Sequence, residues 1–333
     1  MTRTEINITQ VSNNMKKYII LAVIIALITG AAVISGTRET TKTQFVLNTV
    51  STIKIKGNNS GAVDKAFARI SEIESHMSSY ITTSDIVTGT LNADTSYVIS
   101  KGLDYGNISE GKFDITVKPL CDLWDINGDN PRVPAQQEIS AVLPLINYQK
   151  VFFYNGKLVM EEGMALELGA IAKGYAADEA CRILRENGVE DGFVDLGGNV
   201  VAMGTKTVGI RNPISKNNGD YFGTIKLTDS AVATSGGYER YFEQDGKRYH
   251  HIFDPQTGYP VETDILSASV ICEKAIDADC WSTILFSAGV EKAQEYISRY
   301  SLNAILADVN KNVYVFGNVN FTPEQSSGFK VVK

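Results

Sequence analysis

The chain of 333 residues has few of the side chains that most often build metal and redox centres. It contains three histidines and four cysteines. The cysteines Cys121, Cys181, Cys272 and Cys280 lack the spacing of metal ligands, which argues against a zinc site of the His/Cys kind. Cys181 and Cys280 fall within apolar helical patterns and are expected to be small buried side chains. The spacing leaves disulfide connectivity open.

The sequence also lacks a basic block, an internal repeat and a low-complexity segment. Its net charge is −7, so nucleic acid is excluded as a main partner. With 44% hydrophobic and 21% charged residues, it has the balance of a globular protein. Beyond its first residues, the length suits one large domain or two intimate ones.

The N-terminal residues 1–36 carry a targeting pattern. Met15-Lys16-Lys17 precedes an apolar run from Tyr18 to Ile34, and no cysteine follows that could carry a lipid. We expect a cytoplasmic N-terminus and a transmembrane or signal-anchor segment in 1–36, a polar linker over 37–44 and the main domain over 45–333 outside the cytoplasm. The run is short for a spanning helix, so cleavage is the alternative to an uncleaved anchor in the cell membrane.

Strands and helices follow one another without strict alternation, which predicts an α+β fold. Phe45–Ile55 alternates as a strand does, and a helix capped by Ser60 follows it. Near the C-terminus, apolar spacing predicts one helix over Asp277–Ser287 and another over Val290–Tyr300.

The stretch Glu167–Asp178 joins a short strand to a helix. Its glycines and alanines allow another molecule to approach the backbone, and the helix N-terminus suits an anion such as phosphate. It lacks both the Lys-Ser/Thr ending of a P-loop and the Gly-x-Gly-x-x-Gly spacing of a dinucleotide fold. A tightly packed helix start is the alternative.

Asp279 and Thr283 are four residues apart in a predicted helix, so a carboxylate and a hydroxyl share one face. With a backbone carbonyl from elsewhere, they could hold a hard cation such as Mg²⁺. Capping of the helix N-terminus by acidic residues is the alternative.

The segment His250–Pro260 presents polar groups on a loop fixed by an Asp-Pro turn and by Gly258. His251 could act as a general base or orient a phosphate. The alternative is an ordinary turn with an exposed histidine pair.

Taken in order, seven segments resemble the FAD:protein FMN transferases of the ApbE type. The matching segments are Met77-Ser-Ser-Tyr80, Gly111–Leu120, Glu167–Asp178, Asp195-Leu-Gly-Gly-Asn199, Ala233–Tyr238, His251–Gly258 and Ala278–Thr283. The resemblance covers the chain from about Phe45 to the C-terminus.

The resemblance implies largely antiparallel sheets packed with helices, in a T-fold-like arrangement. It implies an enzyme that uses Mg²⁺ and FAD, and that joins FMN through a phosphoester to a Thr or Ser of an extracytoplasmic acceptor protein, with release of AMP. The metal would be held by Asp279, Thr283 and the carbonyl of Ala170, and His251 would do the acid–base work. Contacts to the flavin and nucleotide would fall on Tyr80, Phe113, Asp114, Glu167, Lys173 and Phe253.

The sequence departs from the family pattern at three places. Cys280-Trp281 replaces smaller residues, Ser282 stands where some members carry a second acid, and Thr49–Thr52 only partly matches an N-terminal segment. Two alternatives share the predicted site: an enzyme that hydrolyses FAD to FMN and AMP, and a flavin-binding carrier without chemistry. No segment of this chain matches a Ser/Thr acceptor motif, which indicates that the acceptor is another protein.

Overall fold

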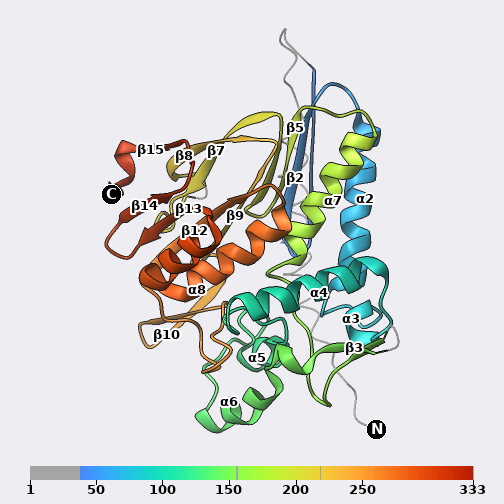
Figure 1. Ribbon diagram of the computed structural model, residues 1–333, viewed down its shortest axis with the longest axis vertical. Coiled ribbons are helices and arrows are strands. Elements are labelled where there is room, and N and C mark those ends of the chain that lie inside the picture. The colour runs from blue at the N-terminus through green and yellow to red at the C-terminus, as the bar shows by residue number, and fades with distance from the viewer. Residues whose placement is uncertain (1–37, 155–156, 218, 333) are drawn as a thin grey trace, which may run out of the picture. The chain divides into compact units, whose positions relative to one another are not determined.

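A nine-stranded sheet forms the centre of the computed structural model, which describes residues 38–154, 157–217 and 219–332 (Figure 1). Neighbouring strands pair antiparallel, except that the last two, β14 and β16, are parallel. In spatial order the strands are β1 (Glu39–Val46), β2 (Thr49–Lys56), β5 (Gly192–Leu196), β6 (Asn199–Met203), β9 (Ala231–Gly236), β12 (Ile265–Cys272), β13 (Asn303–Asp308), β14 (Asn312–Phe316) and β16 (Lys330–Val332).

Alternation along the central strands buries both faces of this sheet. In β13, Ala304 and Leu306 belong to the larger apolar core, whereas Ile305 and Ala307 belong to a second core on the other face. Successive side chains of a strand point to opposite faces, so a continuous apolar run is what a strand covered on both sides requires.

Helices cover one face and a small sheet covers the other (Figure 1). Helix α8 (Ala275–Tyr300) packs on β9 and β12, and α7 (Ala172–Glu186) packs on β5, β6, α8 and α2 (Ser60–Met77). The second core lies under a three-stranded sheet with the order β15 (Phe321–Pro323), β8 (Tyr221–Thr228) and β7 (Thr205–Arg211). The mixed, largely antiparallel α+β architecture is therefore confirmed.

Further helices and two strand pairs complete the described part of the chain. They are the helices α3 (Asp85–Thr88), α4 (Ala93–Ile108), α5 (Lys118–Trp124) and α6 (Gln136–Val142), the 3-10 turns η1 (Leu143–Leu145), η2 (Tyr148–Lys150) and η3 (Gln325–Ser327), and the paired strands β3 (Phe152–Tyr154) with β4 (Lys157–Val159) and β10 (Tyr241–Gln244) with β11 (Lys247–His250).

The expected linker over 37–44 is wrong from Glu39 onward. Strand β1 pairs with β2 across a turn in which Leu47 and Asn48 both have positive φ, so the compact unit begins at Glu39 rather than at residue 45. The expected strand Phe45–Ile55 is the turn and part of both arms of this hairpin. The residues of β1 were expected to form a linker because this edge strand is mostly polar and only one of its eight residues is buried.

The two C-terminal helices are confirmed, since α8 is interrupted at Gly289, whose φ of 75° and ψ of 165° are not helical. The first helix is also confirmed, although Asn59 rather than Ser60 caps it through the N–H of Ala62. No helix among the described residues is long and apolar enough to cross a membrane. The expected anchor over residues 18–34 lies outside the described residues.

Candidate functional site

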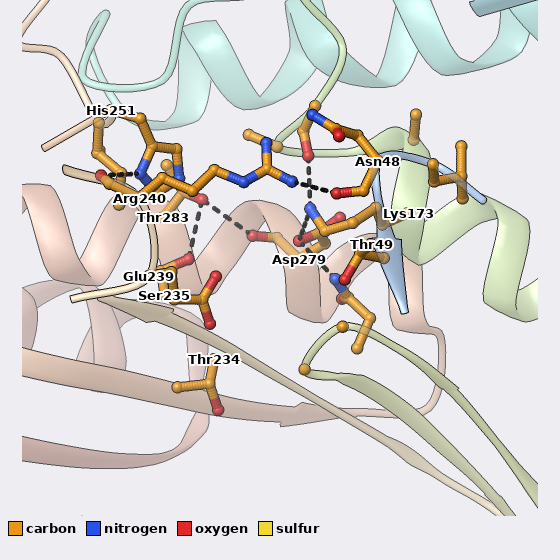
Figure 2. Close-up of a pocket in the computed structure, with 18 of the residues that line it drawn as sticks. Asn48, Thr49, Lys173, Thr234, Ser235, Glu239, Arg240, His251, Asp279 and Thr283 are labelled. Atoms are coloured by element: carbon orange, nitrogen blue, oxygen red, sulfur yellow. Dashed lines mark hydrogen bonds and ion pairs between the residues drawn. The ribbon is translucent and has the colours of Figure 1, made fainter. Parts of the chain in front are cut away.

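A cavity of about 960 Å³ opens between the helical face, β2, β7 and the loop after β11. It contains every residue singled out from the sequence, although these residues come from segments as far apart as Tyr80 and Thr283. The ten are Tyr80, Phe113, Asp114, Glu167, Ala170, Lys173, His251, Phe253, Asp279 and Thr283. Figure 2 shows part of this cavity, with Lys173, Asp279, Thr283 and His251 arranged around it. The structure thus brings the predicted residues together, while their individual roles stay predictions.

The contact between α7 and α8 fixes the position of Asp279. A Cβ at Gly174 would lie 2.4 Å from the carbonyl oxygen of Ala275, so only glycine allows the helices to approach this closely. The N–H of Gly174 donates to Oδ2 of Asp279 over 3.0 Å. No described N–H group donates to the carbonyl of Ala170, which is the usual i−4 partner of Gly174. One hydrogen bond therefore both orients the carboxylate and leaves a backbone oxygen available.

Further oxygen atoms surround Asp279, which is only 4% exposed. Asn199 donates its Nδ2 to Oδ1 of Asp279 over 3.2 Å, and the Oδ1 of Asn199 is buried with no partner among the described residues. Thr283 donates its hydroxyl to the carbonyl of Asp279 over 3.3 Å and lies 3.2 Å from Oγ of Ser235 (Figure 2). A buried carboxylate, an unpaired amide oxygen, a hydroxyl and a free carbonyl are the donors that a hard cation prefers, so the residues present fit Mg²⁺.

Helix capping does not explain Asp279. It is the fifth residue of α8, and its carboxylate bonds to α7 and β6 instead of to its own helix. Asp178 of α7 does the capping, since its carboxylate accepts the N–H groups of Ala275 and Ile276 over 2.8 and 3.0 Å. Burial raises the pKa of Asp178 to about 6. An acidic residue therefore caps the N-terminus of α8, as the alternative reading of the sequence proposed, but this residue is Asp178 and not Asp279.

His251 lies at the side of the cavity and is not part of an exposed pair. Its Nδ1 is 3.2 Å from the carbonyl of Arg240, which can only accept, so Nδ1 carries the hydrogen and Nε2 keeps its lone pair. Burial, and then the charge of Arg240, lower the pKa of His251 to about 3, so the ring is neutral at pH 7. The neighbouring His250 is buried, with Nε2 3.0 Å from the carbonyl of Val261.

Two charged residues flank the entrance to α7. Lys173 donates to the carbonyl of Gly169 over 2.6 Å, and its Nζ lies 3.9 Å from Oδ1 of Asp279. Glu167 accepts from the hydroxyl of Ser79 over 2.6 Å and from the N–H of Gly169 over 2.9 Å. Lys173 therefore brings a positive charge to the cavity, whereas Glu167 holds the loop in place.

Three aromatic residues, Tyr80, Phe113 and Phe253, also line the cavity. Tyr80 is 62% exposed, with the ammonium of Lys118 4.9 Å from its ring centre, so one large ring is open to a ligand. Phe253 is buried against Trp124, with ring centres 6.0 Å apart, and Phe113 is buried beside Tyr105.

Asp114 is committed to the fold. Its carboxylate accepts three hydrogen bonds, from the N–H and the hydroxyl of Thr116 and from the N–H of Tyr148, over 2.6 to 3.0 Å. Burial raises its pKa. Asp114 thus shapes the wall behind Phe113, and a direct contact with flavin stays a prediction.

Sequence reasoning missed several residues that line the cavity. Asn199 and Ser235 lay inside quoted segments, but no spacing rule connects them to an aspartate in α8. Arg240 donates to the carbonyl of Asn48 over 2.9 Å and so joins the β1–β2 turn to the loop before β10. Glu239 also lines the cavity, and burial raises its pKa.

The partly matching segment Thr49–Thr52 reaches the cavity as well. Gly197 and Gly198, in the turn after β5, both have positive φ, and a Cβ at Gly197 would lie 2.2 Å from Oγ1 of Thr49. The glycine pair is therefore required both by its backbone conformation and by the approach of Thr49.

Comparison with known proteins identifies related sequences. The model of the ApbE family matches residues 47–306. A protein of Klebsiella pneumoniae (strain 342) named FAD:protein FMN transferase is 37% identical over 231 residues, which cover 68% of this chain and 72% of that protein. One of the same name from Treponema pallidum (strain Nichols) is 34% identical over 218 residues, or 59% of this chain and 60% of that protein.

Solved structures show the same fold. The crystal structure of the ApbE protein from Thermotoga maritima MSB8 matches with a TM-score of 0.76 and 28% identity, over 87% of this chain and 98% of that one. The flavin transferase ApbE from Vibrio cholerae matches with a TM-score of 0.73 and 21% identity, over 88% and 99% of the two chains.

Proposed function

The chain belongs to the ApbE family and is an enzyme of the FAD:protein FMN transferase type, and we propose that it moves FMN from FAD to a Ser or Thr hydroxyl of a partner protein. The carrying observation is the convergence of Asp279, Thr283, Ala170 and Lys173 with the free Nε2 of His251 in one cavity. The cavity volume of about 960 Å³ falls in the upper part of the range that ligand pockets occupy.

The diphosphate of FAD is proposed to lie at the entrance to α7. The ammonium of Lys173 and the positive end of the α7 dipole supply positive charge there. Tyr80, at the open side, offers a ring face on which the flavin can stack. The substrate would therefore place its flavin against Tyr80 and its diphosphate beside Lys173.

His251 is proposed to be the general base. The acceptor hydroxyl gives its proton to Nε2, its oxygen bonds to the phosphorus of the FMN half, and the bond from that phosphorus to the bridging oxygen breaks, so that AMP leaves. The hydrogen bond from Nδ1 to the carbonyl of Arg240 holds the ring in the required tautomer. An anionic substrate beside the ring would raise the pKa of His251 above its value of about 3.

Mg²⁺ is proposed to be held by the carboxylate of Asp279, the hydroxyl of Thr283 and the carbonyl of Ala170, with Oδ1 of Asn199 as a further oxygen. When bound, it would neutralise negative charge on the phosphates. Independently of it, Gly174 and Asn199 orient the carboxylate, and Ser235 positions the hydroxyl of Thr283.

The same site could release FMN and AMP if water replaced the acceptor hydroxyl, so hydrolysis of FAD is the second candidate. A carrier without chemistry is disfavoured, because binding alone gives no reason for a base with a free lone pair beside the cation site. We also propose that the N-terminal segment anchors the enzyme in the cell membrane with its catalytic domain outside, on the basis of the two lysines and the apolar run of residues 16–34.

The transfer is tested by incubating the full chain with FAD, MgCl₂ and membrane proteins from the producing cells after deletion of this chain. The expected result is a fluorescent flavin band that survives denaturing electrophoresis and whose mass exceeds that of the unmodified protein by one FMN. Consumption of FAD with no flavin bound to any protein would support the hydrolase instead. The Asp279→Asn variant should neither attach flavin to a protein nor consume FAD.

A further inference from the structure

A second cavity, of about 740 Å³, lies beside the cavity that contains Lys173, His251 and Asp279, which is called the flavin cavity below. The second cavity has no part in the chemistry proposed so far. Among the described residues, its charged lining consists of four cationic side chains and a single carboxylate: Arg211, Lys216, Lys247, Arg248 and Glu262. The chain as a whole carries a net charge of −7, so this positive lining stands against the overall balance. Such a surface favours an anionic partner.

The cavity is also rich in tyrosine, since Tyr238, Tyr241, Tyr249 and Tyr259 line it. Tyr241 is 42% exposed, and the guanidinium of Arg248 lies 4.0 Å from its ring centre. Tyrosine and arginine are the side chains that most often dominate protein recognition, because they offer large contact areas with polar ends. The lining therefore has the composition of a peptide-binding surface.

The existing ion pairs do not block an acidic ligand. Lys247 pairs with Glu262 over 2.6 Å, and Arg248 pairs with Glu243 over 3.2 Å. All four side chains are between 46% and 80% exposed, and exposed pairs contribute little to stability. A carboxylate of a partner can replace Glu262 or Glu243 at small cost, and Lys216 has no ion pair among the described residues.

One thin wall separates the two cavities. Arg211 and Tyr238 line both, with the guanidinium 5.0 Å from the ring centre. The consecutive residues His250 and His251 line different cavities, His250 the second and His251 the flavin cavity. The second cavity therefore adjoins the cavity that contains the proposed base.

We propose that the second cavity docks an acidic, extended segment of the protein that receives FMN, and that the reactive Ser or Thr of this segment passes the Arg211–Tyr238 wall to reach His251. This inference rests on the proposed transfer, for which it supplies the binding surface of the second substrate. The docking proposal explains why a positively charged, aromatic cavity lies next to the flavin cavity. The diphosphate of FAD does not need these cations, because Lys173 lines the flavin cavity.

The test is the binding of fluorescein-labelled peptides to the full chain in the presence of FAD, followed by anisotropy. One peptide carries a Thr flanked by aspartates and a tyrosine, and a second has lysines in place of the aspartates. The expected result is at least about tenfold tighter binding of the acidic peptide, and a reversed preference in the double variant Lys216→Glu/Lys247→Glu. Its affinity for FAD, measured by flavin fluorescence, should stay unchanged.

Lys292→Glu is the matched control. Like Lys247, Lys292 pairs with a nearby glutamate and has its ammonium over a tyrosine ring, at 5.7 Å compared with 5.6 Å, but it lies on α8 outside both cavities. This variant should keep the preference for the acidic peptide. Loss of the preference in Lys292→Glu to the same degree would overturn the docking proposal, since net charge alone would then explain it.

Two other results would also overturn it: equal binding of both peptides to the unmodified chain, or a double variant that alters only self-association in sedimentation, which would assign the surface to a second copy of the chain. Failure of the transfer itself has a different signature. In that case no protein gains FMN even with the unmodified chain, whereas failure of the docking proposal leaves FMN transfer equally efficient in the double variant.

Discussion

The N–H of Gly174 in α7 donates to Oδ2 of Asp279 in α8 over 3.0 Å, so two residues 105 positions apart in sequence share one hydrogen bond at the proposed cation site. The bond is possible only because a glycine lets the helices touch. It also leaves the carbonyl of Ala170 without its usual partner. The geometry of the site is thus a direct consequence of helix packing.

Gly174→Ala should destabilise the protein and weaken the site together. The added Cβ would lie 2.4 Å from the carbonyl oxygen of Ala275, and separation of the helices should cost about 1–3 kcal/mol of unfolding free energy. Urea denaturation measures this loss. Gly61→Ala in α2 is the control, because its Cβ would meet nothing closer than 3.9 Å and should be neutral or slightly stabilising. Equal stability of the two variants would refute the packing argument.

Asp279→Asn should abolish stabilisation by Mg²⁺. The amide can still accept the N–H of Gly174, so the fold is kept, whereas the negative charge that favours a cation is lost. We expect MgCl₂ to raise the melting temperature of the unmodified chain and to have at least about tenfold less affinity for the variant. Asp277→Asn serves as control, since Asp277 binds Lys101 and Tyr105 away from the cavity. A full Mg²⁺ response in Asp279→Asn would rule out the assigned ligand.

His251→Gln should lose FMN transfer by about 10²–10⁴-fold while FAD affinity changes little. Glutamine can still donate to the carbonyl of Arg240, but it offers no basic nitrogen. Single-turnover kinetics at saturating FAD measure the chemical step directly. Normal turnover in this variant would remove His251 from the reaction and leave it a structural residue.

Acidification should destabilise the protein partly through His251. Its pKa is about 3 when folded and about 6.5 when unfolded, so the unfolded chain binds a proton that the folded chain does not. This contribution to stability is complete above pH 6.5 and is lost progressively as the pH falls toward about 3. His250, whose pKa is also lowered, acts in the same direction. In urea titrations at several pH values, His251→Gln should lose less stability over that window than the unmodified chain; a parallel loss would contradict the shift.

Much of the fold could be predicted because its patterns are local. Apolar spacing predicted two C-terminal helices. In the structure they are the two parts of α8, which is interrupted at Gly289. The strand β1 could not be predicted because an edge strand rich in threonine has no continuous apolar face. Strand β1 is stabilised by its pairing with β2, and the residues of β1 alone do not predict this pairing.

Only those residues of the candidate site that belong to a local sequence motif could be predicted. Asp279 and Thr283 share a helix face by spacing, but the role of Gly174 depends on how two helices cross. Asn199 and Arg240 contribute through contacts to distant segments, which no local pattern encodes. The second cavity could not be predicted for the same reason. Its cationic residues are spread over residues 211–248 and become neighbours only in the folded chain.

The most direct test of the account compares the AMP released with the FMN bound to protein in one reaction of the full chain with FAD, MgCl₂ and the membrane proteins described above. Chromatography measures AMP, and the absorbance of the precipitated, washed protein measures bound flavin. The account predicts equal amounts of the two, and neither product with Asp279→Asn. AMP formed without protein-bound FMN would contradict the transfer and identify a hydrolase.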